Sequence, residues 1–222
     1  MGSKFPVVTI DGPSASGKSS VSRELARHLG WNWVSTGAFY RGLALFATRK
    51  GVALDNQDLL TKLCDDQRWR VVMTAERTCV WIEDEDVTAL LETEQIGAAA
   101  SQVSRLSKVR ESLLVPQRRC SEMGPGLVAE GRDCGTVVFP EAPFKFYLTA
   151  DSEQRALRRS LQVGDDVKNT LELQKRRDDR DMNRTIAPLE IPTNAMVIDS
   201  SSMPLNQVVD SVLREIKTHL GG

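Results

Sequence analysis

VVTIDGPSASGKSS, residues 7–20, is the stretch that decides the fold of this chain. Its apolar start predicts a buried strand, and the G-x-x-x-x-G-K-S spacing that follows leads directly into an amphipathic helix. In such a turn the backbone N–H groups surround an anion, and the start of the helix adds the positive end of its dipole. The stretch therefore predicts a phosphate-binding loop between a strand and a helix.

The polar side chains of this loop have predicted roles. Lys18 reaches the β- and γ-phosphates of a nucleoside triphosphate, and the Ser19 hydroxyl ligates Mg2+. Asp11, just before the loop, has two open interpretations: contact with the metal through water, or hydrogen bonds that hold the loop in place. The residues predicted to bind the triphosphate are Gly12, Pro13, Ser14, Ala15, Ser16, Gly17, Lys18, Ser19 and Ser20.

Composition limits the functions open to the chain. Its 222 residues, 41% of them hydrophobic, suffice for one sizeable core and a subdomain. Lys plus Arg number 29 and Asp plus Glu 30, so no overall charge favours nucleic acid or an anionic membrane. No apolar run approaches the roughly 20 residues of a membrane span, and no signal-peptide pattern is present. We expect a cytoplasmic protein that binds neither nucleic acid nor membrane.

Short apolar runs alternate with longer helical patterns along the chain. This alternation predicts an α/β fold with a five-stranded parallel sheet wrapped by helices. In such sheets ligands bind at the carboxyl ends of the strands, where Asp11, Ser35 and Glu130 stand. The predicted strands are Val7–Ile10, Asn32–Ser35, Gly126–Ala129, Phe144–Leu148 and Ala195–Ile198, and the predicted helices include Lys18–Leu29, Arg105–Met123, Ser152–Gln162 and Leu205–His219.

The middle of the chain breaks this alternation. Arg68–Thr74 and Cys79–Glu83 are predicted as two strands around a polar turn, and Asp86–Thr88 as a short third strand. An antiparallel unit is thus inserted between the second and third core strands. Because no long Gly/Ser linker separates it, we expect an appendage that can rotate within a single domain, residues 1–222.

Two polar clusters point to a second substrate that carries phosphate. A turn after the second strand leads into a helix bearing Arg41, whose planar guanidinium can hold a phosphate through two hydrogen bonds. The run 130–136 follows a buried strand, needs Gly131 for a tight bend, and projects Arg132 and Asp133. The structural alternatives are an exposed arginine in the first case and a plain turn in the second.

A third cluster is RRDDRDMNR, residues 176–184, which follows three arginines within residues 155–159. In a helix, Arg177, Asp181 and Arg184 fall at i, i+4 and i+7 and share one face. Charge runs of this kind usually form a solvated, salt-bridged helix. Residues 155–184 hold nine basic and six acidic side chains and few large apolar ones, which favours a mobile lid that supplies arginines.

Taken together, these motifs resemble those of the bacterial cytidylate kinases over essentially the whole chain. TIDGPSASGKS, STGAFYR, AASQVSRLSKVRESLL, GLVAEGRDCGTVVFP, KFYLTAD and RRDDRDMNRTIAPL appear in the family's order. The resemblance implies a P-loop nucleoside monophosphate kinase that transfers the γ-phosphate of ATP to CMP or dCMP with Mg2+ as cofactor. It also implies a monomer, with a monophosphate-binding subdomain and its β insert at about 36–110 and a lid at about 155–184.

The resemblance assigns roles to particular residues. Arg41, Arg132 and Arg177 would hold the CMP phosphate, and Asp181 would accept hydrogen bonds from the sugar. Cytosine has an amino donor beside two acceptors, which suits a carboxylate flanked by guanidinium groups; uracil places an oxygen there, so UMP should be rejected. The residues implied to bind CMP are Thr36, Arg41, Ser101, Arg110, Arg132, Asp133, Arg177, Asp181 and Arg184, of which Ser101, Arg110, Asp133 and Arg184 face the cytosine. Those implied to meet the transferring group are Lys18, Arg132, Arg155 and Arg159, with Arg158 sharing the role.

Alternative functions leave parts of the sequence unexplained. A P-loop GTPase would need an N-K-x-D signature, which does not occur. An ATPase without an acceptor would give the arginines of EGRD and RDDRDMNR no role. A broad UMP/CMP kinase or a small-molecule kinase of similar fold is nearer, and the cytosine-facing set argues against it. No catalytic histidine is required, because the attacking phosphate oxygen is already anionic.

Overall fold

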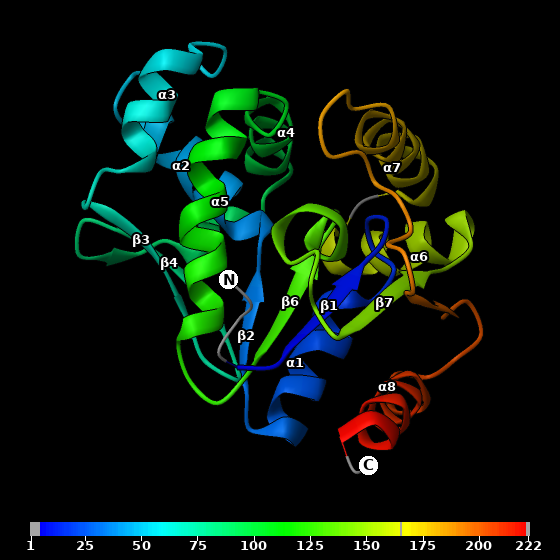
Figure 1. The fold of residues 1–222 in the computed structure, drawn as a ribbon. Coiled ribbons are helices and arrows are strands. Elements are labelled where there is room, and N and C mark those ends of the chain that lie inside the picture. The colour runs from blue at the N-terminus through cyan, green and yellow to red at the C-terminus, as the bar shows by residue number, and fades with distance from the viewer. Residues whose placement is uncertain (1–4, 165, 221–222) are drawn as a thin grey trace.

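A five-stranded parallel sheet forms the centre of the molecule (Figure 1). This computed structural model describes residues 5–164 and 166–220, and the strand order of the sheet is β2-β6-β1-β7-β8. Each strand lies within one or two residues of its predicted ends, and the α/β class is confirmed. The strands are β1 Val7–Asp11, β2 Asn32–Ser35, β6 Leu127–Gly131, β7 Phe144–Thr149 and β8 Met196–Asp199.

The central strand β1 is buried along its whole length and pairs on both sides. Val8 lies opposite Val128 of β6 and opposite Phe144 of β7. The register places Asp11 beside Gly131, and β2 pairs with β6 in the same direction. Because all these strands run in parallel, their carboxyl ends meet at one edge of the sheet. The polar residues that follow the strands therefore gather at that edge.

Helices cover both faces of the sheet. On one face, α1 (Lys18–Leu29) and α8 (Leu205–Leu220) share a core with β1 and β7 that contains Leu25, Phe146 and Ile216. On the other face lie α2 (Gly37–Arg49), α3 (Gln57–Cys64), α4 (Glu94–Val103) and α5 (Ser107–Arg119), the last followed by the 3-10 turn η2 (Cys120–Glu122). The helix predicted over 105–123 is thus shorter. The helices α3 and α4 were not predicted; they span only 8 and 10 residues, which is short for a helix to be recognised by its periodicity.

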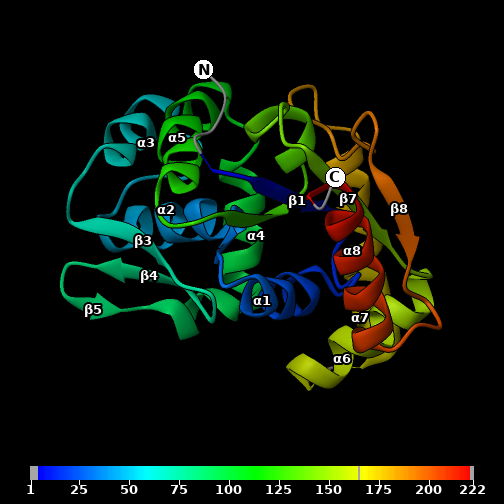
Figure 2. The same cartoon turned by 60° about the horizontal axis from the view of Figure 1, so that its bottom comes forward.

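The predicted antiparallel insert is present as a three-stranded sheet in the order β3-β4-β5 (Figure 2). Its strands are β3 Trp69–Met73, β4 Thr78–Ile82 and β5 Glu85–Asp86. The prediction that the third strand reaches Thr88 was wrong. The Asp86 carboxylate accepts hydrogen bonds from Thr88 N and Oγ1, which turns the chain into the 3-10 helix η1 (Thr88–Glu92).

The helices α6 (Ser152–Val163) and α7 (Val167–Met182) form a hairpin on the opposite side of the molecule from the insert (Figures 1 and 2). The prediction that Arg184 shares a helix face with Arg177 was wrong. The helix ends at Met182, because Asn183 caps it by donating from Nδ2 to Asp179 O at 2.8 Å. Within the described ranges, no helix combines the length and apolar character needed to cross a membrane.

The insert is docked on α2. Trp69 and Val80 are buried against Gly42, where an ideal Cβ would lie 2.9 Å from Val80 Cγ1 and 3.2 Å from the Trp69 ring. Only a residue without a side chain allows this approach. The insert and the helix that carries Arg41 therefore form one packed unit.

Replacing Gly42 by leucine is expected to lower the free energy of unfolding by about 1–3 kcal/mol, because the added side chain overpacks this contact. Denaturant unfolding followed by circular dichroism measures the change. Gly37→Ala on the same helix is the matched control, since a Cβ there meets only Ser35 Oγ at 3.8 Å. Equal stabilities for the two variants would contradict the docking described here.

Candidate active site

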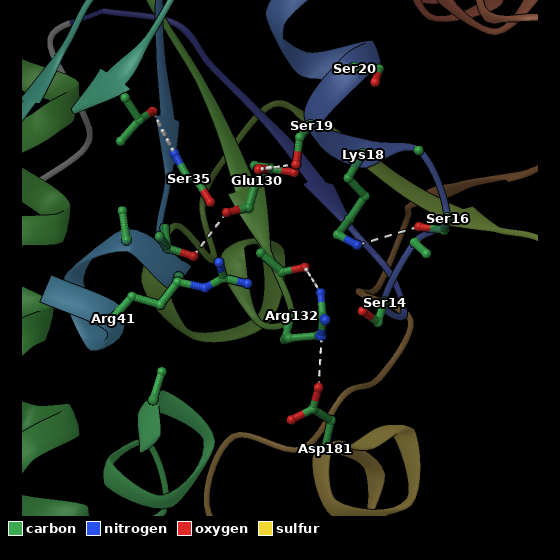
Figure 3. A pocket seen from close by; sticks show the side chains of 18 of the residues that line it. Ser14, Ser16, Lys18, Ser19, Ser20, Ser35, Arg41, Glu130, Arg132 and Asp181 are labelled. Carbon is green, nitrogen blue, oxygen red and sulfur yellow. Dashed lines mark hydrogen bonds and ion pairs between the residues drawn. The ribbon is translucent and has the colours of Figure 1, made fainter. Parts of the chain in front are cut away.

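The loop between β1 and α1 is closed around its own lysine. Gly17 caps α1 with a φ of 92°, a left-handed conformation that favours glycine. Lys18 Nζ donates to Pro13 O at 2.5 Å and to Ser16 Oγ at 3.4 Å (Figure 3). Burial, and secondly the nearby Arg132, lower the pKa of Lys18 to about 7. An anion bound in the loop would favour the charged form of this lysine.

Two oxygen groups at the start of α1 fit a magnesium ion. Ser19 Oγ donates to Glu130 Oε1 at 2.7 Å, and Glu130 is 3% exposed (Figure 3). Its other oxygen, Oε2, is buried and has no hydrogen-bond partner among the described residues. A hydroxyl and an unsatisfied carboxylate oxygen are ligands that Mg2+ accepts together with phosphate oxygens. Within the described residues, no three His, Cys, Asp or Glu side chains gather as a ready metal site.

Asp11 is fully buried, and both of its carboxylate oxygens have partners. They accept hydrogen bonds from Cys134 N at 2.8 Å and Gly135 N at 2.7 Å. Burial raises the pKa of Asp11 to about 6. Of the two interpretations of Asp11, hydrogen bonding describes this structure, but the segment it holds is the turn after β6, where Cys134–Val138 form one π-helical turn (η3).

Position 131 needs a glycine because neighbouring side chains lie very close to its backbone. An ideal Cβ there would lie 2.3 Å from Thr36 Oγ1 and 2.8 Å from Cys134 Sγ. Thr36 Oγ1 donates to Glu130 O at 2.9 Å, so its hydroxyl pins β6 to the start of α2. The bend predicted at this glycine is confirmed, and it sets Arg132 and Asp133 beside the phosphate-binding loop.

Arg110 and Asp133 form a buried ion pair in the cavity, with each residue about 5% exposed or less. Arg110 Nη2 donates to Asp133 Oδ2, and its Nη1 donates to Ser104 O at 3.1 Å. Arg184 lines the same cavity, and its buried Nη2 has no hydrogen-bond partner within the part of the chain that the structure describes. The cluster therefore presents a carboxylate next to guanidinium donors.

A second ion pair links the α6–α7 hairpin to the bend after β6. Arg132 Nε donates to Asp181 Oδ2 at 2.8 Å, and its Nη1 donates to Gly12 O at 3.0 Å. Figure 3 shows Arg41 and Arg132 pointing into the same space. The Arg177 side chain also lines this space and has no hydrogen bond or ion pair with any residue in 5–164 or 166–220. Burial, then Arg132 and Arg41, lower the pKa of Arg177 to about 10.

The three arginines of α6 differ in position. Arg155 is buried and does not line the cavity, so the structure does not bring it to the other predicted catalytic residues. Its Nη1 instead donates to Ser14 O at 3.0 Å and to Asp178 Oδ2 at 2.5 Å. Arg158 and Arg159 both line the cavity, and Arg158 Nη2 donates to the Ser200 backbone oxygen at 2.6 Å.

A single cavity of about 980 Å3 brings most of the predicted residues together. Gly12 and Pro13 do not line it, but their backbone oxygens accept hydrogen bonds from Arg132 and Lys18, which do. The predicted site residues that line it are Ser14, Ala15, Ser16, Gly17, Lys18, Ser19, Ser20, Thr36, Arg41, Ser101, Arg110, Arg132, Asp133, Arg159, Arg177, Asp181 and Arg184.

The apolar end of this cavity was not predicted. It is lined by Leu161, Met203, Leu205 and Val208. Leu161 belongs to α6, Met203 precedes α8, Leu205 and Val208 lie in the first turn of α8, and no motif joins them. Only the amphipathic pattern of the two helices could have suggested apolar faces there.

Comparison with known proteins gives close relatives. Residues 8–218 match the family model described as cytidylate kinase. A cytidylate kinase of Bdellovibrio bacteriovorus is 53% identical over 214 residues, which cover 96% of this chain and 99% of that protein. One of Pseudomonas putida is 45% identical over 223 residues and covers 97% of each. A solved structure of an uncharacterized protein from Eubacterium ventriosum has a TM-score of 0.54 at 14% identity, covering 96% and 98% of the chains, which shows the fold alone.

Asp178→Ala is expected to lower the free energy of unfolding by about 3–5 kcal/mol, because it leaves the buried Arg155 guanidinium without its anion. Glu172→Ala on the same helix is the control: its partner Arg176 lies 3.8 Å away and both side chains are more than 70% exposed, so little change is expected. Denaturant unfolding of both variants makes the comparison. If both variants lose a similar free energy of unfolding, the buried pair contributes no more than the exposed one, and the expectation is wrong.

Proposed function

The chain belongs to the cytidylate kinase family, and on that premise we propose how its residues carry out the family's reaction. It is a nucleoside monophosphate kinase that transfers the γ-phosphate of ATP to CMP or dCMP, giving ADP and CDP or dCDP. One observation carries the assignment of roles: a single cavity is lined by the phosphate-binding loop, the Arg110–Asp133 pair and the Arg132–Asp181 pair.

The donor nucleotide occupies the part of the cavity along α1. Its phosphates lie on the backbone N–H groups of residues 14–20, at the positive end of the helix dipole, with Lys18 on the outer phosphates. Ser19 and Glu130 would hold Mg2+, which supplies positive charge to the triphosphate when bound. The apolar end formed by Leu161, Met203 and Leu205 suits the face of the donor's base.

The acceptor nucleotide occupies the part lined by α2, α5 and the bend after β6. Arg41, Arg132 and Arg177 bind its phosphate, and the lack of a partner for Arg177 among the described residues supports this role. Asp181, held in place by Arg132, accepts hydrogen bonds from the sugar. Thr36, whose hydroxyl is turned toward β6, lines the floor of this site.

Cytosine faces the buried ion pair. Asp133 Oδ2 is held by Arg110, and its Oδ1 takes no hydrogen bond from the described residues, so it is free to accept from the amino group of the base. The unpartnered Nη2 of Arg184 is a donor for the ring acceptors, and Ser101 lines the same wall. Uracil would place an oxygen against the Asp133 carboxylate, which is a strong basis for discrimination.

In the transfer step, an oxygen of the acceptor phosphate attacks the γ-phosphorus in line as the bond to the ADP oxygen breaks. The attacking oxygen is already anionic, so no general base is needed. Lys18, Arg132 and Arg159 stabilise the charge that spreads over the transferring group. Arg155 acts as a positioning residue, because it fixes Ser14 of the loop against the lid.

The subdomains close around the two nucleotides. The unit at about 36–110 moves with its docked insert, and the lid at about 155–184 brings Arg159 over the phosphates. Closure excludes water, which would otherwise attack ATP. We further propose that the enzyme acts as a monomer, since the cavity already holds residues for both nucleotides, and in the cytoplasm, where its four unpaired cysteines would stay reduced.

Burial lowers the pKa of Lys18 to about 7, so at a pH about one unit higher this side chain is mostly neutral in the free protein. The phosphates of ATP favour its charged form, and ATP binding at that pH is therefore expected to take up protons. Affinity for ATP should accordingly fall as pH rises above that value. Isothermal titration calorimetry in two buffers of different ionisation enthalpy measures the uptake. Lys18→Arg, which stays charged, is the control that subtracts the titration of ATP itself; equal uptake in both proteins would refute the assignment.

Asp133→Asn is expected to reduce the ratio of kcat/KM for CMP to that for UMP by about 10- to 100-fold, because the charged acceptor for the amino group is lost. Glu111→Gln, an exposed carboxylate next to Arg110 in the sequence, should leave the ratio unchanged. Initial rates of ADP formation with each acceptor, and with none, give both ratios. An unchanged ratio in Asp133→Asn would remove this residue from base selection.

A further inference from the structure

The side chain of Arg41 is held by η1, the short helix that follows the insert. Its Nη1 donates to Leu91 O at 2.6 Å and lies 3.5 Å from Glu92 Oε2. The Arg41 side chain is 19% exposed, whereas that of Glu92 is 73% exposed. The ion pair thus joins a guanidinium of fixed position to an exposed carboxylate. This carboxylate can rotate away into the solvent with little loss of free energy.

The same segment contacts the lid. Arg159 Nη2 donates to Glu92 O at 3.5 Å and lies 3.8 Å from Glu94 Oε2. The residues from Leu91 to Glu94 therefore join an arginine of the acceptor site to an arginine of the lid. None of the nucleotide-binding motifs quoted from the sequence includes this segment.

Glu92 places negative charge where the acceptor site is rich in cations. Arg132 has a partner in Asp181, but Arg177 has none among the described residues. The pKa of Arg177 falls first because of burial and then because of Arg132 and Arg41, so these guanidinium groups repel one another. A carboxylate beside Arg41 offsets that repulsion as long as no phosphate is bound.

We propose that Glu92 is a displaceable counter-anion for Arg41, which the phosphate of the acceptor nucleotide must push aside in order to bind. The proposal rests on the function proposed above, in which Arg41 binds that phosphate. A phosphate brings up to two negative charges and a geometry that matches a guanidinium through two hydrogen bonds, so it wins over one exposed carboxylate. Glu92 thereby makes acceptor binding weaker than the arginines alone would make it.

Steady-state kinetics of Glu92→Gln test the proposal. The variant is expected to lower KM for CMP by about two- to five-fold, the range typical of an exposed ion pair, with KM for ATP unchanged. The difference should shrink at high ionic strength, because salt screens the pair. Glu85→Gln is the matched control: Glu85 pairs with Arg49 of the same helix α2 at 2.7 Å, away from the cavity. An unchanged or raised KM for CMP in Glu92→Gln overturns the proposal.

Two further measurements locate the effect. Cytidine, which has no phosphate, is used as a competitive inhibitor, and its inhibition constant should be the same in wild type and Glu92→Gln. Introducing Glu92→Gln into an Arg41→Gln background should no longer lower KM for CMP, because position 41 then carries no charge for Glu92 to neutralise. Tighter cytidine binding, or the full effect in that background, overturns the proposal. If Arg41→Gln alone leaves KM for CMP unchanged, the role of Arg41 in phosphate binding fails first, which separates the two conclusions.

Discussion

The buried carboxylate of Asp11 is the interaction on which the rest of the site depends. It stands at the end of the central strand, between the phosphate-binding loop and the bend after β6, and it accepts two backbone N–H groups of that bend. Breaking these hydrogen bonds would leave a buried carboxylate unpaired, which costs free energy. The carboxylate therefore holds its two donors in place. The bend is therefore held against β1, and Arg132 and Asp133 are fixed at the same edge as Lys18.

A chain with a net charge of −1 builds a site crowded with arginines by pairing most of them internally. Arg110 and Arg132 are paired with Asp133 and Asp181, and each pair also presents groups to the cavity. Buried ion pairs give little net stability, since desolvation offsets the Coulomb attraction. Their value here is positional: the charges are aimed before the nucleotides arrive, so little reorganisation is needed at the moment of transfer.

The α6–α7 hairpin is joined to the rest of the protein at separate places. Arg155 Nη1 donates to Ser14 O of the loop, Ser14 N donates to Asp178 Oδ1, and Arg159 contacts the segment after the insert. The contacts with Ser14 are partly buried and the contact of Arg159 is exposed, so they differ in how readily they break. In the function proposed above, a firmer connection near the start of α6 and a looser one farther along it suit a lid that moves while its arginines stay close to the phosphates.

The sequence by itself determined the sheet, the phosphate-binding loop and the existence of the insert, because each depends on local spacing and apolar periodicity. Most of the predicted site residues line the cavity. Parallel strands bring Glu130 and the residues after it to one edge, whereas the family resemblance supplied Ser101 and Arg110. The short helices α3 and α4 were not predicted, and Arg184 was placed on a helix that ends two residues earlier.

Only the tertiary structure decided which charged side chains meet. Arg155 and Asp178 are separated by 23 positions, and Arg41 and Glu92 lie on different elements. A guanidinium reaches several carboxylates in principle, and packing selects one. In this fold Arg155 contacts the loop, Arg177 has no partner among the described residues, and Glu92 lies beside Arg41. Spacing along the chain specifies none of these contacts.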